Sequence, residues 1–155
     1  MSWKRSIGAL LLLALTACGG NQRLQQEVDA WLVQYNQTYQ QLSYAANQAD
    51  WQSQTHIVEG DTTNAARTRA AKGDLAKFVG SVGNIEKIRG YLKRADRLTP
   101  LQVAQLNMML FYAGDSPGLV PEVVKQRIAA ETEQTEKLYG FGFTLKGKPL
   151  TPNDI

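Results

Sequence analysis

The sequence predicts an all-α protein, with about four amphipathic helices arranged as antiparallel hairpins and a short extended arm at the C-terminus. Apolar residues recur at steps of three or four over most of the chain, and helix start and stop signals separate these stretches. With 155 residues, of which 43% are hydrophobic and 20% charged, the chain has the composition of one globular domain.

The first predicted helix runs from Leu24 to about Trp51. Its apolar stripe consists of Val28, Trp31, Leu32, Tyr35, Tyr39, Leu42, Ala46 and Ala49. Steps of three or four place these residues on one face, while the facing residues are mostly Gln and Asn, which suit solvent or a wet cleft. We expect the aromatic residues of the stripe to belong to the core and not to a ligand site.

The second predicted helix spans about Thr63 to Arg94 and follows the capping sequence "GDTTN". Its apolar positions are Leu75, Phe78, Val79, Val82, Ile85, Ile88, Tyr91 and Leu92. Four glycines interrupt the pattern, namely Gly73, Gly80, Gly83 and Gly90, each costing about 0.8–1 kcal/mol relative to Ala in a helix interior. We therefore expect close helix packing or a kink in this segment.

The third predicted helix has Thr99 as N-cap and Pro100 at its first position, and it stops at Gly114. It is apolar almost all round near its end, so burial on more than one side is expected. A fourth helix starts at Pro121 and ends at Gly140. Its inner residues are Val124, Ile128, Thr135 and Leu138, and its outer ones Glu131, Glu133, Gln134 and Glu136.

The tail alternates Phe141, Phe143 and Leu145 and then turns at "KGK", which predicts a short hairpin or an extended arm. The closing "TPNDI" has the pattern of a further helix start, so the chain is expected to stop within a larger architecture.

Residues 1–17 have the pattern of a bacterial lipoprotein signal peptide. Two cations, Lys4 and Arg5, precede an apolar run too short to span a membrane, and the run ends in Leu15-Thr16-Ala17-Cys18. This order matches the lipobox, in which cleavage precedes the cysteine and the cysteine is acylated. We predict a lipid anchor at Cys18, a tether over residues 18–23 and a helical region over residues 24–155.

Acyl chains on Cys18 would hold the protein in the inner or outer membrane of the bacterial cell envelope, facing the periplasm. Loss of the two signal-peptide cations from the 17 in the sequence leaves 15 against 14 anions, so the mature chain is nearly neutral. The basic isoelectric point therefore gives no reason to expect a nucleic-acid partner. Because Cys18 is the one cysteine, acylation also leaves no thiol for a disulfide or a zinc site.

Charge is unevenly distributed along the mature chain. Nine cations lie between Arg67 and Arg97, against the three anions Asp74, Glu86 and Asp96. A basic face of this kind can meet lipid head groups or an acidic partner. The simpler interpretation, which we favour, is a solvated helix face whose last cations complement a helix C-terminus.

Catalytic motifs are not found in the sequence. His56 is the one histidine, with Glu59 three residues later, whereas a zinc peptidase site of the HExxH type needs two histidines one turn apart. Nucleophile-elbow, dinucleotide-binding, P-loop and EF-hand patterns are also lacking. We therefore assign no catalytic residue and no metal ligand in this chain.

The order of features resembles the N-terminal part of the peptidyl-dipeptidase A family, the angiotensin-converting-enzyme-like metallopeptidases. The resemblance rests on "VDAWLVQYNQTYQQLSYAANQADW", on Trp51, Thr55 and Ile57 in a W-x-x-x-T-x-I arrangement, and on "EKLYGFGFTLKGKPLTPNDI". It extends from about Glu27 to Ile155 and covers a minor N-terminal part of such an enzyme. Where the family often has Asn and Thr around that isoleucine, this chain has His56 and Val58.

The resemblance implies a helical lid over the deep cleft of a zinc-dependent carboxydipeptidase. Zinc, with chloride as an optional second ion, and the catalytic groups would lie in a missing catalytic portion of the same protein. With that portion the protein would hydrolyse peptides and release dipeptides; alone, the chain is expected to be inactive. The alternative is a self-contained, non-enzymatic periplasmic lipoprotein that binds a partner protein.

Overall fold

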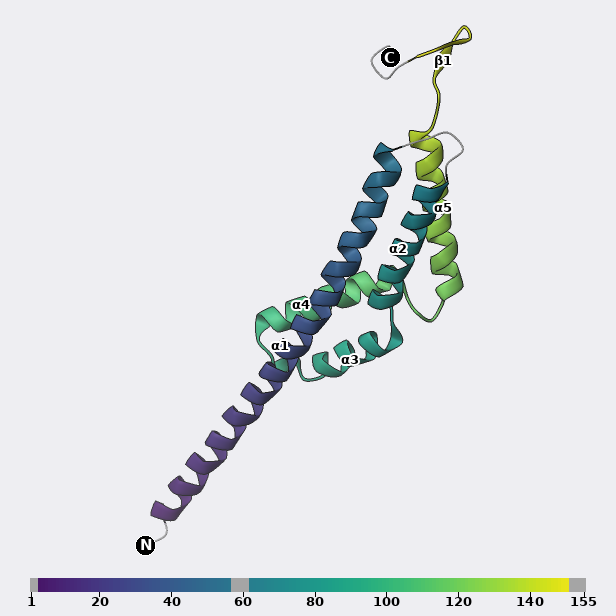
Figure 1. The fold of residues 1–155 in the computed structure, drawn as a ribbon. Coiled ribbons are helices and arrows are strands. Elements are labelled where there is room, and N and C mark those ends of the chain that lie inside the picture. The colour runs from purple at the N-terminus through teal and green to yellow at the C-terminus, as the bar shows by residue number, and fades with distance from the viewer. Residues whose placement is uncertain (1–2, 57–61, 151–155) are drawn as a thin grey trace.

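The computed structural model describes the backbone of residues 3–56 and 62–150, and side chains from residue 20 onward within these ranges. The fold is all-α, as predicted (Figure 1). Its helices are α1 (Trp3–Thr55), α2 (Thr63–Val79), α3 (Val82–Leu92), α4 (Pro100–Gly114) and α5 (Pro121–Tyr139), with a 3-10 turn, η1 (Ala95–Arg97). Strands β1 (Thr144–Leu145) and β2 (Lys148–Pro149) form a small antiparallel hairpin.

Helix α1 is the axis of the molecule and continues through 53 residues, including the segment predicted to be the signal peptide. Helix α2 returns antiparallel along its C-terminal half, and α5 lies along α2 on the other side (Figure 1). Helices α3 and α4 form a second hairpin, which packs on α1 nearer its N-terminal end. Among the helices of the described residues, none is long and apolar enough to cross a membrane.

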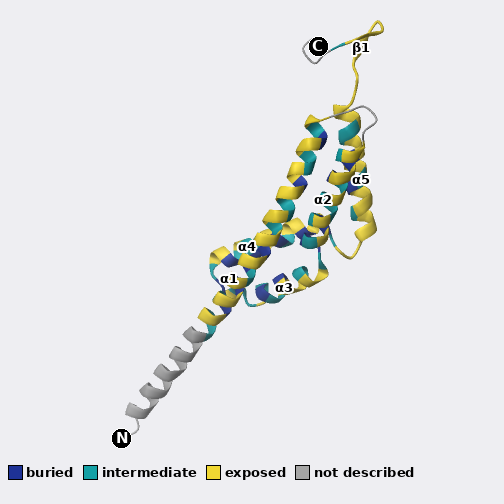
Figure 2. Ribbon diagram, viewed as in Figure 1, coloured by how far each residue is buried: buried dark blue, intermediate teal, exposed yellow. Residues whose placement is uncertain are grey.

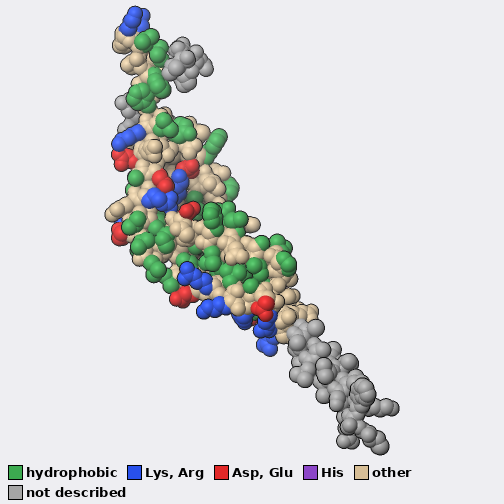
Figure 3. Space-filling view, turned by 180° about the vertical axis from the view of Figure 1, so that it is seen from behind, with side chains coloured by type: hydrophobic (Ala, Val, Ile, Leu, Met, Phe, Trp, Pro, Cys, Tyr) green, Lys and Arg blue, Asp and Glu red, His purple; other side chains and the backbone are tan. Residues whose placement is uncertain are grey.

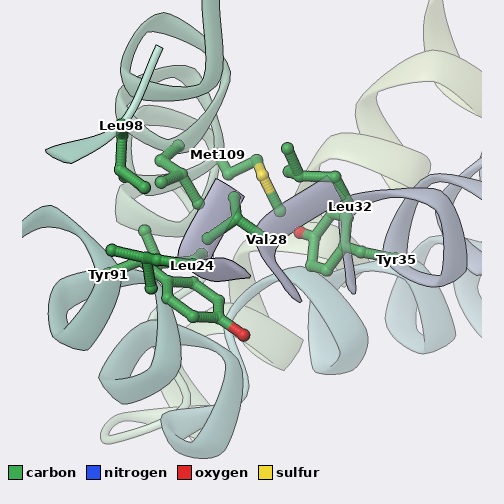
Figure 4. Packing of buried hydrophobic residues seen from close by; sticks show 9 residues of the cluster. Leu24, Val28, Leu32, Tyr35, Tyr91, Leu98 and Met109 are labelled. Carbon is green, nitrogen blue, oxygen red and sulfur yellow. The ribbon is translucent and has the colours of Figure 1, made fainter. Parts of the chain in front are cut away.

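The main core lies where α1 meets the α3–α4 hairpin (Figures 2 and 4). Helix α1 contributes Leu24, Val28, Leu32 and Tyr35, α3 contributes Ile88 and Tyr91, and Leu98, Leu106 and Met109 complete the cluster. The stripe predicted for the first helix therefore faces the core. Its aromatic residues belong to the packing, as Trp31 lies 5.4 Å from Tyr35 and 5.5 Å from Tyr91 between ring centroids.

The predicted second helix is broken into α2 and α3 at Gly80 and Ser81. Ser81 restarts the chain as N-cap of α3 by accepting a hydrogen bond from Asn84 N at 3.2 Å. The break coincides with the loop between α4 and α5, whose Gly118 N donates to Gly80 O at 2.8 Å. The expected kink is thus found as a break where the backbone of the loop packs directly on Gly80. The approach is so close that a Cβ at Gly80 would lie 1.5 Å from Ser116 O.

The predicted start of the third helix is confirmed and has a second role. Thr99 Oγ1 accepts from Gln102 N at 3.2 Å and Gln102 Oε1 accepts from Thr99 N at 3.0 Å, forming a capping box. The buried Gln102 amide nitrogen also donates to Gln25 O at 2.9 Å and to Asp29 Oδ1 at 2.6 Å. One side chain therefore caps α4 and ties it to α1.

Two predictions of burial are wrong in part. Helix α4 buries Leu106 and Met109 but leaves Met108 and Phe111 exposed, so it is covered on one side only within the described chain. On α5 the exposed Leu138 is not an inner residue, and Thr132 is buried instead. Thr132 Oγ1 donates to Ile128 O at 2.7 Å, which satisfies the hydroxyl without a partner on another helix.

The predicted C-terminal arm is confirmed as the β1–β2 hairpin, with a turn at Lys146 (φ 51°) and Gly147 (φ 77°). Two consecutive positive φ values are typical of the tight turns that join such short strands. The "TPNDI" segment lies outside the described residues.

Replacement of Gln102 by Leu is expected to lower the free energy of unfolding by about 2–3 kcal/mol. The change removes the side-chain half of the capping box, since the backbone N of residue 102 still donates to Thr99 Oγ1, and it leaves Thr99 N, Gln25 O and the Asp29 carboxylate without their side-chain partner. Urea unfolding followed by circular dichroism measures the loss. The exposed Gln126→Leu is the control, and equal stability of the two variants would contradict the role given to Gln102.

Replacement of Gly80 by Ala is expected to destabilise the fold by about 1–3 kcal/mol, because the new methyl group collides with the Ser116 carbonyl. Gly73→Ala, within helix α2, which ends just before Gly80, is the matched control. No atom lies within 4 Å of its added Cβ, so it should stabilise the protein by about 0.5–1 kcal/mol. Thermal melts of both variants test the opposite signs; a stable G80A protein would refute the close contact.

Candidate interaction surfaces

Of the three signature positions, the structure describes Trp51 and Thr55, and Ile57 lies outside the described residues. Trp51 and Thr55 are one turn apart on α1, where Thr55 Oγ1 donates to Trp51 O at 2.7 Å. Trp51 is 61% exposed, so its indole is not part of the core of the described chain. For Cys18, only the α1 backbone is described.

His56 is exposed at the end of α1, and in the described residues its ring forms no ion pair with an acidic side chain. Its Nδ1 lies 2.9 Å from Thr55 Oγ1, and its carbonyl oxygen accepts from Asn64 Nδ2 at 3.2 Å. These contacts tie the end of α1 to the start of α2. Glu59 lies outside the described residues.

Zinc does not fit the side chains that the structure describes. Within residues 20–56 and 62–150, no three His, Cys, Asp or Glu side chains come together as metal ligands. A structural or catalytic zinc site needs at least three such ligands. We therefore derive no chemical step through a metal in this part of the chain.

One apolar exposed surface is the outer side of α4, here called the α4 face and formed by Leu101, Met108, Phe111 and Tyr112. Their exposed fractions are 68%, 53%, 71% and 46%. Spacings of seven and four residues put Leu101, Met108 and Tyr112 on one stripe, with Phe111 beside it. Exposed apolar patches of this kind mark interaction sites.

Aromatic rings of α1 extend the α4 face. The rings of Tyr39 and Tyr112 stack with centroids 6.5 Å apart, and those of Phe111 and Tyr112 meet edge to face at 5.8 Å. A hollow of about 160 Å³ lies between the two helices, lined in part by Tyr35 and Met108. The flexible thioether of Met108 adapts to the shape of a partner, and the aromatic rings bury a large apolar area on contact, which suits a docking surface.

A second candidate surface is a groove of about 680 Å³ between α2, α5 and the loop before α5. Its floor is largely apolar, with Ala76, Val124 and Ile128, and three cations stand around it, Arg69, Lys77 and Lys125. Arg69 lies 3.9 Å from Glu136 Oε2, at the limit of an ion pair. The size falls in the range of ligand-binding clefts.

The groove was not anticipated from the sequence. Its end is formed by Ser116, Pro117 and Gly118, which belong to a loop and carry no periodic signal. The sequence did indicate the apolar excess of α4, and only the structure separates its buried side from the α4 face.

Two tyrosines near the α4 face and the core are held in their neutral form. Burial, with a smaller effect of Tyr39, raises the pKa of Tyr35 to about 12. Burial, then the hydrogen bond to Glu27, raises the pKa of Tyr91 to about 12; its hydroxyl donates to Glu27 Oε1 at 3.1 Å. Both phenols therefore support packing only while they are protonated.

Comparisons of the chain with family models, with curated proteins and with solved structures give no match. The function of the chain is therefore inferred from its residues and their geometry.

We expect Tyr35 and Tyr91 to ionise at a pH about two units higher than a free phenol does. Because their pKa values are raised in the folded state, the stability they contribute is complete below about pH 10 and is lost as the pH rises toward about 12. Absorbance at the phenolate band, followed from neutral to alkaline pH, measures this. Tyr91→Phe should remove one late-titrating group, and an unchanged titration curve would contradict the assignment.

Proposed function

We propose that residues 24–155 form the lid region of a peptidyl-dipeptidase-like zinc metallopeptidase, held at the bacterial cell envelope by a lipid on Cys18. In this proposal, peptide hydrolysis with release of dipeptides belongs to a catalytic portion that supplies zinc and all reacting groups. The described chain contributes a helical cover that limits access to small peptides.

The exposed α4 face carries the proposal. Met108, Phe111 and Tyr112 form an apolar edge that stays 53%, 71% and 46% exposed in the described chain, although Tyr112 stacks on Tyr39 and Met108 borders the hollow beside Tyr35. A lid needs a permanent apolar contact with the body that it covers. A self-contained domain would be expected to bury the end of α4, which is apolar almost all round.

The position of the signature residues supports the same proposal. Trp51 is exposed near the C-terminal end of α1 and Thr55 donates to its carbonyl, so these two signature residues lie at the end of α1 that leads to α2. An exposed tryptophan at a helix end is available to pack against further protein.

The second candidate is a self-contained helical lipoprotein that binds a partner protein without catalysis. One observation favours it: every buried side-chain nitrogen and oxygen in the described residues has a hydrogen-bond partner. The core between α1, α3 and α4 is thus closed by itself. Under this candidate the α4 face binds a separate protein.

The test combines the chain with the protein encoded in frame after codon 155. Purified residues 19–155 with zinc are expected to release no dipeptide from a blocked tripeptide beyond a metal-chelated control. Addition of the downstream protein should restore release. Met108→Ser with Phe111→Ser should weaken association at least tenfold, because each apolar side chain contributes roughly 1.5–3 kcal/mol when buried.

Val33→Ser, which alters an exposed apolar residue of α1 outside the α4 face, is the matched control and should leave association unchanged. A downstream sequence without HExxH, together with a monomeric chain that melts sharply, would overturn the lid proposal in favour of the second candidate. Dipeptide release by residues 19–155 alone would overturn both.

A further inference from the structure

The corner between α3 and α4 is fixed against the first residues after Cys18. Arg97 donates from Nη2 to Gly20 O at 2.9 Å and from Nε to Asn21 Oδ1 at 2.8 Å. Gln25 Nε2 donates back to Arg97 O at 3.0 Å. Because α1 continues through this region and rises about 1.5 Å per residue, Gly20 lies only about 3 Å along the axis from Cys18.

Basic side chains gather at this corner (Figure 3). We define the anchor-side patch as Arg23 on α1 together with Arg89, Lys93 and Arg94 at the C-terminal end of α3. Arg23, Arg89 and Lys93 are exposed, and the Arg94 guanidinium lies 5.8 Å from the centre of the Tyr91 ring.

Asp96 in η1 and Glu27, which accepts a hydrogen bond from Tyr91, lie at the same corner, and the four cations of the patch outnumber them. In the described part of the chain, none of its four cations forms an ion pair. The ion pairs that do occur lie on the helices nearer the other end, as with Lys72 and Asp50 at 2.6 Å. Complementing the C-terminus of α3 accounts for the α3 cations in part, but it does not account for Arg23.

We propose that the anchor-side patch binds the anionic phospholipid head groups of the membrane that carries the lipid on Cys18. The inference rests on the lipid anchor of the proposed function. Lipid charge acts over a Debye length of about 8 Å at physiological ionic strength, and the hydrogen bonds of Arg97 hold the corner within that range. The tether supplies a high effective concentration, so a weak contact suffices.

Contact through this patch orients the domain on the membrane. The anchor end of α1 points to the lipid, while the β1–β2 hairpin lies at the opposite end of the molecule (Figure 1). The lipid therefore anchors the protein, and contact of the anchor-side patch with the membrane surface sets the tilt of α1.

The test uses the chain from residue 18, which holds the whole described core, with Cys18→Ser to remove the thiol. Its partition to vesicles of phosphatidylcholine is compared with partition to vesicles that also contain phosphatidylglycerol. The anchor-side variant is Arg23→Gln/Arg89→Gln/Lys93→Gln. The matched control, Lys77→Gln/Lys125→Gln/Lys148→Gln, makes the same change in net charge away from the corner.

We expect binding that requires phosphatidylglycerol and is lost at high salt. The anchor-side variant should bind about a hundredfold more weakly, at about fivefold for each cation removed, and the control variant should keep the parent affinity. Equal weakening of both variants, or equal binding to both vesicle types, would overturn the proposal that the anchor-side patch binds anionic lipid.

The anchor is tested separately by labelling expressing bacteria with a fatty acid. Label on the full chain that disappears in Cys18→Ser supports the anchor. An unlabelled chain would overturn the anchor and with it this inference, whatever the vesicles show. A labelled chain without preference for phosphatidylglycerol would overturn the patch alone and leave the proposed function in place.

Discussion

The amide of Gln102 holds the described fold together at the junction of its two hairpins. This buried amide accepts a hydrogen bond from Thr99 N through its oxygen. Its nitrogen donates hydrogen bonds to Gln25 O and to the Asp29 carboxylate. A buried amide with each polar atom satisfied favours one arrangement of its neighbours over all others. The angle between α4 and α1 is set by these bonds, and the cluster of Val28, Leu106 and their neighbours packs within that frame.

The same junction determines what remains exposed. Once Leu106 and Met109 face α1, the helical period turns Met108 and Phe111 toward solvent. The corner that η1 makes before α4 then holds Arg97 against Gly20 and Asn21 of α1, directly after the last cations of α3. The exposed apolar side of α4 and the basic corner thus follow from one helix crossing, and the two proposals rest on these two surfaces.

Local chemistry made much of this fold predictable. Thr99 and Pro100 begin a helix, Gly114 ends it, Pro121 begins the next, and Lys146-Gly147 makes the turn of the arm, because each signal acts through its own backbone. The break at Gly80 could not be located, since it depends on a loop more than thirty residues later. The groove and the outward side of α4 were unpredictable for the same reason: both are products of tertiary packing. The signature residues gave a hypothesis about function, and the structure describes two of the three.

The contact between Gly80 and Gly118 has a consequence for how the groove can vary. Its end is closed by a hydrogen bond between two backbones with no side chain between them, so the width there is set by the main chain. Residues along the floor, such as Val124 and Ala129, can therefore change the depth and polarity of the cleft without moving the two backbones at Gly80 and Gly118. Chains that retain both glycines could therefore keep the backbone of this cleft while differing in the ligands that bind to it.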